Sequence, residues 1–187
     1  MIPDRLALYS QRMASVTLWF IVAMLLLNMG CWLWPSLNSV KAGYGIGFSL
    51  TDGLISRLGI DVWAFPWWQK AGSIVLSSVP LLILAAGLRH LRSLFQSYGR
   101  REYFSASTAS HLGKVGKSVG LWVILSLLCE PLLSAWSTML EPVGHRVVTL
   151  SLGSPYIVAL FLAACIAIIA RILRQASELD SEHRQFV

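Results

Sequence analysis

The sequence has little charge and lacks the motifs of common enzymes. Charged residues make up 13% of its 187 residues, whereas a soluble globular domain carries about 25%. No P-loop, nucleophile elbow or zinc-protease motif occurs in it, so the chemistry that those motifs support has no basis here. With a hydrophobic fraction of 56%, the scarcity of charge indicates a membrane protein, and we do not expect an enzyme.

Cysteine is also scarce, and its pattern argues against a disulfide framework and against a zinc site. The three cysteines, Cys31, Cys129 and Cys165, are odd in number and fall in apolar runs. Their spacing fits neither a disulfide framework nor a zinc site. We therefore expect no metal, and we expect these thiols to act as small apolar side chains in a helix bundle.

Long uncharged apolar runs are what the sequence has in abundance. A helix needs about 20 predominantly apolar residues to cross a bilayer. Four such spans are predicted, at about residues 14–34, 71–88, 118–140 and 150–170. The first has a longer apolar core than a signal peptide and no small-residue cleavage site after it, so it is retained. The fold class is therefore predicted to be all-α, a four-helix integral membrane bundle that forms a single domain over the whole chain.

Basic residues are distributed unevenly between the two sides of this bundle. The N-terminal end, the connection at 89–117 and the tail at 171–187 hold eleven Lys and Arg, and the opposite side, with its long loop at 35–70, holds four. The positive-inside rule then places both termini in the cytoplasm. We expect a multi-pass protein of the bacterial inner membrane, whose net charge of +6 attracts anionic lipid headgroups rather than nucleic acid.

The connection at 89–117 is predicted to be helical and to make contacts. Apolar residues from Leu88 to Tyr98 recur at helical spacing, so the second span continues as an amphipathic helix that Gly99 ends. Ser105 is a candidate N-cap for a helix that runs into the third span. Contact with lipid headgroups or with a protein partner is predicted for Arg89, Arg92, Arg100, Arg101, Lys114 and Lys117.

Small residues and tryptophans give two further expectations. Gly116 and Gly120 form a small-residue face that favours close packing of helices. Tryptophans gather around the loop at 35–70, at positions 32, 34, 63, 67 and 68. We expect them to form an aromatic belt at the outer membrane interface, and a platform for a sugar or lipid is the alternative.

Glu130 is the one charged residue inside the four spans. A charge at the bilayer centre costs about 2.5–3.5 kcal/mol on insertion scales, so this carboxyl has to be neutralised by protonation or face polar groups inside the bundle. When residues are counted from the ends of the spans, Asn28, Ser77 and Ser78 are expected at about the same depth in the membrane as Glu130. Pro131 and Pro80 each remove a backbone hydrogen bond and free a carbonyl nearby. These four polar residues are either a site for a proton or ligand, or a structural contact between helices.

Histidine offers little support for a cofactor. His90 and His111 are predicted in the inner connection, His145 at the outer end of the third span and His183 in the tail. Haem ligation between two helices requires a pair of facing histidines inside the bundle, and none of the four lies in mid-span. We therefore expect no cofactor, and haem bound through His90 or His111 is not favoured.

Two segments resemble a known family. One is residues 94–116, LFQSYGRREYFSASTASHLGKVG, and the other is residues 171–187, RILRQASELDSEHRQFV. Together with four spans, they resemble the bacterial membrane proteins of domain-of-unknown-function family 2975. The resemblance implies a four-helix inner-membrane protein of unassigned activity, and a regulatory pairing with a helix-turn-helix protein encoded nearby. It implies no catalytic residues.

These features favour a protein that works by contact. The first hypothesis is a non-enzymatic accessory or regulatory membrane protein whose partners are the lipid bilayer and either another protein or further copies of itself. The alternative is a small transporter or proton-coupled carrier that uses Glu130.

Overall fold

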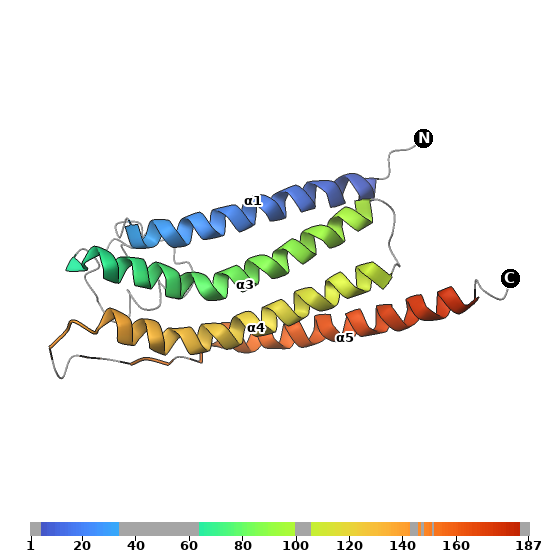
Figure 1. The fold of residues 1–187 in the computed structure, drawn as a ribbon. Helices are drawn as coiled ribbons and strands as arrows, with labels where there is room; N and C mark the ends of the chain where they lie inside the picture. Colours follow the sequence, from blue (N-terminus) through green and yellow to red (C-terminus); the bar gives the residue numbers. More distant parts are fainter. Residues whose placement is uncertain are drawn as a thin grey trace. The chain divides into compact units, whose positions relative to one another are not determined.

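The structure is a computed structural model that describes residues 5–33, 64–99, 106–142, 146, 148–150 and 152–183, and every structural statement below concerns these residues. They form four long helices (Figure 1), which are α1 (Arg5–Leu33), α3 (Trp67–Gly99), α4 (Ala106–Ser137) and α5 (Ser154–His183). Most of the loop predicted at 35–70 lies outside the described residues, as do Arg100, Arg101, Ser105 and His145.

Each of these four helices is long and apolar enough to cross a membrane. The chain is therefore an all-α, multi-pass membrane protein, as the apolar runs predicted. The side on which its termini lie stays a prediction.

The helices extend beyond the predicted spans at the ends where the sequence turns polar. The 33 residues of α3 measure about 50 Å at 1.5 Å per residue, well above the roughly 30 Å of hydrocarbon. The helix continues to Gly99, which confirms the predicted continuation of the second span. The next helix, α4, begins at Ala106, directly after the predicted cap.

The C-terminal end of α4 and the N-terminal end of α5 differ from the ends of the predicted spans. A turn follows α4 from Thr138 onward, and the N–H of Glu141 donates to the Thr138 carbonyl at 3.1 Å. At the other end of this connection, α5 begins at Ser154 rather than near residue 150. Pro155 lies in its first turn, where a missing N–H costs no helical hydrogen bond. Glycine and proline thus decide where this helix starts, although the apolar run begins earlier.

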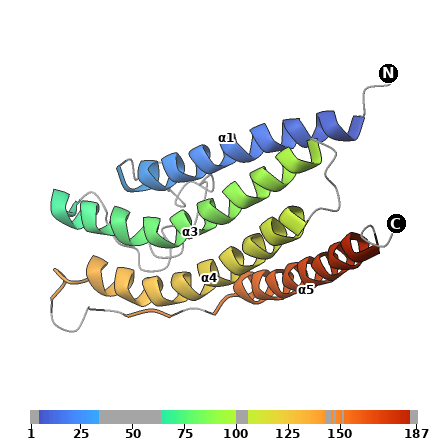
Figure 2. The ribbon, with the colours of Figure 1, turned by 45° about the vertical axis from the view of Figure 1, so that its right-hand side comes forward.

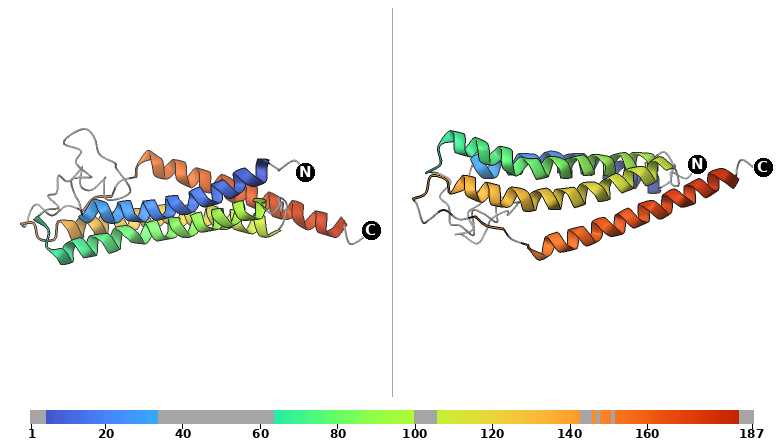
Figure 3. Two further views of the ribbon diagram at one scale, coloured as in Figure 1. Left: turned by 90° about the horizontal axis from the view of Figure 1, so that it is seen from above. Right: turned by 60° about the horizontal axis from the view of Figure 1, so that its bottom comes forward.

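The chain divides into two compact units, each described here by itself. Unit 1 contains Met1–Ile21, Ile83–Leu121 and Ser154–Val187, and unit 2 contains Val22–Leu82 and Trp122–Gly153. The helices α1, α3 and α4 each contribute one part to both units, whereas α5 belongs wholly to unit 1 and can be followed in two further views (Figure 3). The prediction of a single membrane domain stays a prediction.

Unit 1 contains parts of α1, α3 and α4 and all of α5, whose ribbons Figure 2 draws from a second side, and small residues let some of these helices approach closely. A Cβ added to Gly87 on α3 would lie 2.7 Å from the Cβ of Ser118 on α4, and one added to Gly116 would lie 3.1 Å from the carbonyl of Ala163 on α5. The predicted small-residue face is confirmed at Gly116. It does not extend to Gly120, which has nothing within 4 Å of an added Cβ.

Unit 2 has a core in which tryptophan side chains are central. Trp32, Cys129 and Leu133 form a buried cluster. Trp32 is 1% exposed, so it lies inside the protein rather than in the outer aromatic belt predicted for it. Its ring carries an N–H donor that finds an acceptor within the unit, as described below, and this allows the indole to be buried.

Trp136 is the second organising aromatic side chain of unit 2. Its ring meets that of Trp68 edge to face, with centroids 5.8 Å apart. It also lies against α3 at Gly72, where an added Cβ would be 2.5 Å from a ring carbon. Glycine at this position is therefore what allows the indole of α4 to contact the backbone of α3.

We expect Gly72→Ala to lower the free energy of unfolding by about 1–3 kcal/mol, because the new methyl group overlaps the ring of Trp136 and the ring has to move. Denaturant unfolding of the purified protein in detergent measures this change. Gly120→Ala is the matched control, with no close neighbour, and should leave the stability unchanged or raise it by up to about 1 kcal/mol. Equal stability of the two variants would contradict the contact.

Candidate functional site

Unit 2 buries many polar side chains on its helices. The residues below 9% exposure are Asn28, Gln69, Ser73, Ser77, Ser126, Glu130, Ser134, Ser137 and Thr138. On α3 and on α4 they recur every four residues, so each set lies on one face of its helix. Hydrocarbon offers no hydrogen bonds, and such groups have to be satisfied within the protein. These two polar faces, with Asn28 of α1, form the candidate site.

Asn28 links α1 to α3 at the centre of the site. Its Nδ2 donates to the hydroxyl oxygens of Ser77 and Ser78, both at 3.2 Å. Trp32, one turn further along α1, donates from Nε1 to the Ser77 hydroxyl at 3.1 Å. The Ser77 hydroxyl in turn donates to the carbonyl of Ile74 at 3.2 Å. Three of the four predicted site residues are thus in direct contact.

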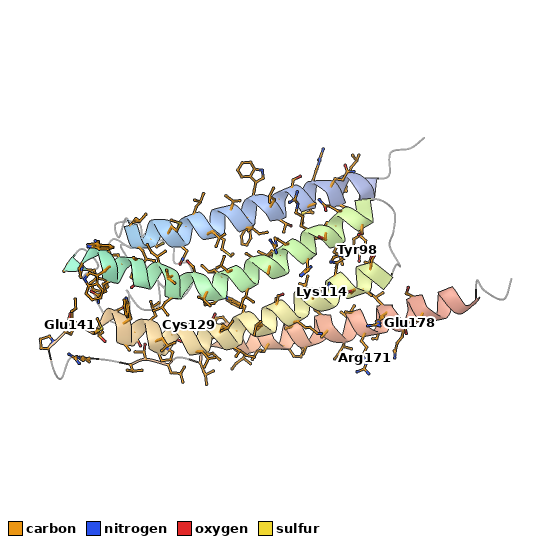
Figure 4. All side chains as sticks on the ribbon, in the orientation of Figure 1. Tyr98, Lys114, Cys129, Glu141, Arg171 and Glu178 are labelled. Carbon is orange, nitrogen blue, oxygen red and sulfur yellow. The ribbon has the colours of Figure 1, made fainter. Side chains whose placement is uncertain are left out.

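Glu130, the fourth, lies on α4 in the same unit, next to Cys129, which Figure 4 labels. It is 6% exposed, and Ser126 and Ser134, one turn away on either side, are 2% and 0% exposed. The carboxyl is therefore on the buried polar face of its helix rather than on an outer face. Binding of a proton or ligand by these four residues stays a prediction.

The end of the site is closed by a reciprocal pair of hydrogen bonds that the sequence did not predict. Gln69 donates from Nε2 to the carbonyls of Trp136 and Ser137, at 3.0 and 3.1 Å. Trp136 donates from Nε1 to the carbonyl of Gln69 at 3.1 Å. The last carbonyls of a helix have no partner within it, so Gln69 satisfies the end of α4. The recurrence of Gln69, Ser73 and Ser77 at four-residue spacing was the available signal.

Two buried polar atoms stand out beside this pair. Gln69 Oε1 and Ser73 Oγ have no hydrogen-bond partner among the described residues, and both residues are 0% exposed. A buried polar atom usually has a partner, since leaving one unpaired costs about 1–3 kcal/mol. The site therefore has acceptor and donor capacity in addition to that used in its internal hydrogen bonds.

The chain after α4 also contacts the polar face. The backbone N–H of Thr149 donates to the hydroxyl of Ser134 at 3.0 Å, and residues 148–150 and 152–153 have no regular secondary structure. The hydroxyl supplies an acceptor that an irregular segment cannot find in its own backbone. The polar face of α4 thus positions the connection that leads to α5.

The other predicted residues lie in unit 1 or outside the described residues. His90 of α3 and His111 of α4 face each other there, with ring centroids 5.7 Å apart. Arg89, Arg92, Lys114 and Lys117 belong to the same unit. Among the residues that the structure describes, no group of three or more His, Cys, Asp or Glu side chains could hold a metal ion.

We expect Gln69→Leu to lower the free energy of unfolding by about 1–3 kcal/mol, because the Ser137 carbonyl loses the Gln69 donor and the Trp136 carbonyl keeps only the longer bond from the Met139 N–H, at 3.4 Å. Denaturant unfolding of the purified protein in detergent measures this change in the free energy of unfolding. Gln96→Leu changes the same residue type on the same helix at an exposed position, and its effect should stay within about 0.5 kcal/mol. If both variants lose the same stability, Gln69 does not stabilise the end of α4.

Comparison with known proteins gives a family but no described relative. No curated protein and no solved structure matches this chain significantly. A family model, described as protein of unknown function DUF2975, matches residues 20–185. The match covers all of α3, α4 and α5 and the C-terminal part of α1 from residue 20 onward, and it agrees with the resemblance seen in the sequence. The chain belongs to domain-of-unknown-function family 2975.

Proposed function

We propose that this chain is a non-enzymatic accessory or regulatory protein that acts by contact with a partner in the membrane. The observation that carries the proposal is the exposure of α5. In the most apolar stretch of α5, 11% is buried within the chain, against 33% in each of the other three helices. A helix that shares so little of its surface with its own chain has the most surface left for another one.

The way in which α5 is attached supports this role. Its buried residues, Ala163 and Ala170, are small and lie on one face, and Gly116 and Gly113 of α4 lie against this face. Ala164 and Ala167 are exposed beside it. Small exposed residues let a second helix come close, and they are enriched where membrane helices associate. We infer that a transmembrane helix of a partner protein packs there.

The C-terminal end of α5 fits a contact outside the hydrocarbon. The helix continues past its apolar stretch to His183, and Arg174 there pairs with Glu178 at 3.0 Å, with both side chains more than half exposed. The positive-inside rule places this charged end in the cytoplasm. A partner is thus offered an apolar surface in the membrane and a charged surface beside it.

A second candidate function is a small proton-coupled carrier. The observation that favours it is Glu130, a carboxyl that is 6% exposed on a transmembrane helix. Ionisable residues within membrane spans commonly mark pathways for ions or protons. Gln69 Oε1 and Ser73 Oγ, which have no hydrogen-bond partner among the described residues, are available for contact with water or a small polar ligand on the same route.

We expect Ala164→Trp to abolish copurification of a stoichiometric partner subunit from native membranes in mild detergent, because the indole fills the space that a second helix needs. Ala71→Trp makes the same change at an exposed alanine of α3 and should leave copurification intact. Copurification that survives Ala164→Trp, or a preparation that never contains a second subunit, would refute the role of α5. Association of identical copies only would point to a homo-oligomer instead.

Glu130→Gln separates the two functions. For a contact protein, we expect this nearly isosteric change to leave partner copurification and folding unchanged, since the amide still forms hydrogen bonds. For a carrier, it should abolish pH-dependent flux in vesicles, because the amide does not take up and release a proton. Glu141→Gln, at an exposed carboxylate, is the control. Loss of flux in Glu130→Gln alone would establish the carrier and displace the first proposal.

A further inference from the structure

Two buried polar atoms on one face of α3 have no hydrogen-bond partner among the described residues. They are Gln69 Oε1 and Ser73 Oγ, and both residues are 0% exposed. Residues four positions apart lie next to each other on a helix, with about 5–6 Å between their Cβ atoms. Leaving a buried polar atom unpaired is unfavourable, so two of them at neighbouring positions indicate a site for a small polar molecule.

The orientation of the Gln69 amide determines what this molecule has to provide. Its Nε2 donates to the carbonyls of Trp136 and Ser137, at 3.0 and 3.1 Å, so both N–H groups of the amide are in use. Exchanging the nitrogen and the oxygen would turn Oε1 toward two carbonyl oxygens, which do not donate hydrogen bonds. Oε1 is therefore the atom that lacks a partner, and since it only accepts, that partner has to be a donor.

Ser73 lacks the bond that a serine within a helix commonly makes. Such a serine donates to the carbonyl three or four residues earlier, as Ser77 does to Ile74. The carbonyl four residues before Ser73 is that of Gln69. It accepts from Nε1 of Trp136 at 3.1 Å and, within the helix, from the N–H of Ser73 itself, so both of its lone pairs are in use. The bond from Trp136 thus leaves the Ser73 hydroxyl available to another partner.

Water fits these two atoms better than an ion does. Both are neutral oxygens, and an ion removed from bulk water is stable only where an opposite charge or many ligands surround it. A calcium ion, for example, takes about six to eight oxygen ligands. Internal water molecules make about two to four hydrogen bonds to polar groups that otherwise lack a partner. Two bonds of the usual O–H···O length span up to about 5.5 Å, which suits side chains one turn apart.

We propose that an internal water molecule bridges Gln69 Oε1 and Ser73 Oγ. The water donates to the amide oxygen and accepts a hydrogen bond from the hydroxyl, so both buried atoms are satisfied. Through Gln69 it is connected to the end of α4, and one turn further along α3 the Ser77 hydroxyl bonds to Asn28. The water therefore extends the hydrogen-bonded layer of the site toward the start of α3. The proposal depends on neither proposed function, because an accessory protein and a carrier both have to satisfy these atoms.

The direct test is NMR spectroscopy of the full chain, labelled with ¹⁵N and purified in detergent. We expect magnetisation transfer from water to the side-chain N–H protons of Gln69 that does not grow with pH, because it arises from a bound water. Loss of the signal in Gln69→Leu assigns it. Gln96, at an exposed position of the same helix, is the control, and its transfer should grow with pH as its protons exchange with bulk water. No transfer to Gln69 in the wild-type chain would overturn the proposal.

Ser73→Ala distinguishes a hydrated hydroxyl from an unpaired one by the sign of its effect on thermal unfolding. With water bound, the variant loses one hydrogen bond, and its midpoint should fall by about 2–4 °C relative to Ser97→Ala. Ser97→Ala makes the same change at a half-buried serine of α3 in unit 1 and corrects for the helix propensity of alanine. Without water, removal of a buried unpaired hydroxyl should raise the midpoint. A midpoint equal to or above that of Ser97→Ala would refute the bridge.

A sodium ion is the other small occupant that these oxygens could contact, and exchange of the salt tests it. Replacing sodium by choline at constant ionic strength should leave the thermal midpoint of the wild-type chain unchanged, because water binding needs no ion. A midpoint that rises with sodium in the wild type, but not in Ser73→Ala, would assign the site to a cation and overturn the proposal. The NMR measurement uses the wild-type chain, so it decides the question even if Ser73→Ala does not fold.

Discussion

Each polar group that this chain places among its helices has to find its hydrogen-bond partner within the protein, because hydrocarbon supplies none. Unit 2 meets much of this requirement with side chains that bond from helix to helix, while Gln69 Oε1 and Ser73 Oγ have no partner among the described residues. Asn28 bonds to Ser77 and Ser78, and Gln69 bonds to the last carbonyls of α4. Individual bonds of this kind contribute about 0.6–2 kcal/mol in membranes. Their larger effect is directional, since they fix which faces of α1, α3 and α4 meet.

The helices of unit 1 pack against one another mainly through small residues. They approach through glycine, alanine and serine, as at Gly87 with Ser118 and at Gly116 with Ala163. Close backbone approach brings many weak contacts into range, and the Ser10 hydroxyl of α1 adds a hydrogen bond to the Phe95 carbonyl of α3.

The sequence predicted much of this arrangement because membranes impose simple limits on it. Length and lack of charge were enough for four spans, and counting depth along them was enough to group Asn28 with Ser77 and Ser78. The start of α5 and the role of Trp32 were not predicted. The first depends on Gly153 and Pro155, which override an apolar run that begins earlier. The second depends on a single acceptor, Ser77, which allows a tryptophan to turn inward rather than toward the headgroups. Gln69 was not predicted because it lies at the edge of the expected outer loop. Position along a membrane span does not indicate there which residues lie at the same depth.

The mutual bonds between Gln69 and Trp136 have a consequence for the dynamics of unit 2. Gln69 holds the final carbonyls of α4, while the Trp136 indole holds the Gln69 carbonyl in the first turn of α3. Helix ends ordinarily fray independently, each at little free-energy cost. From these bonds we expect the two termini to open together and to exchange their amide hydrogens in a single cooperative event.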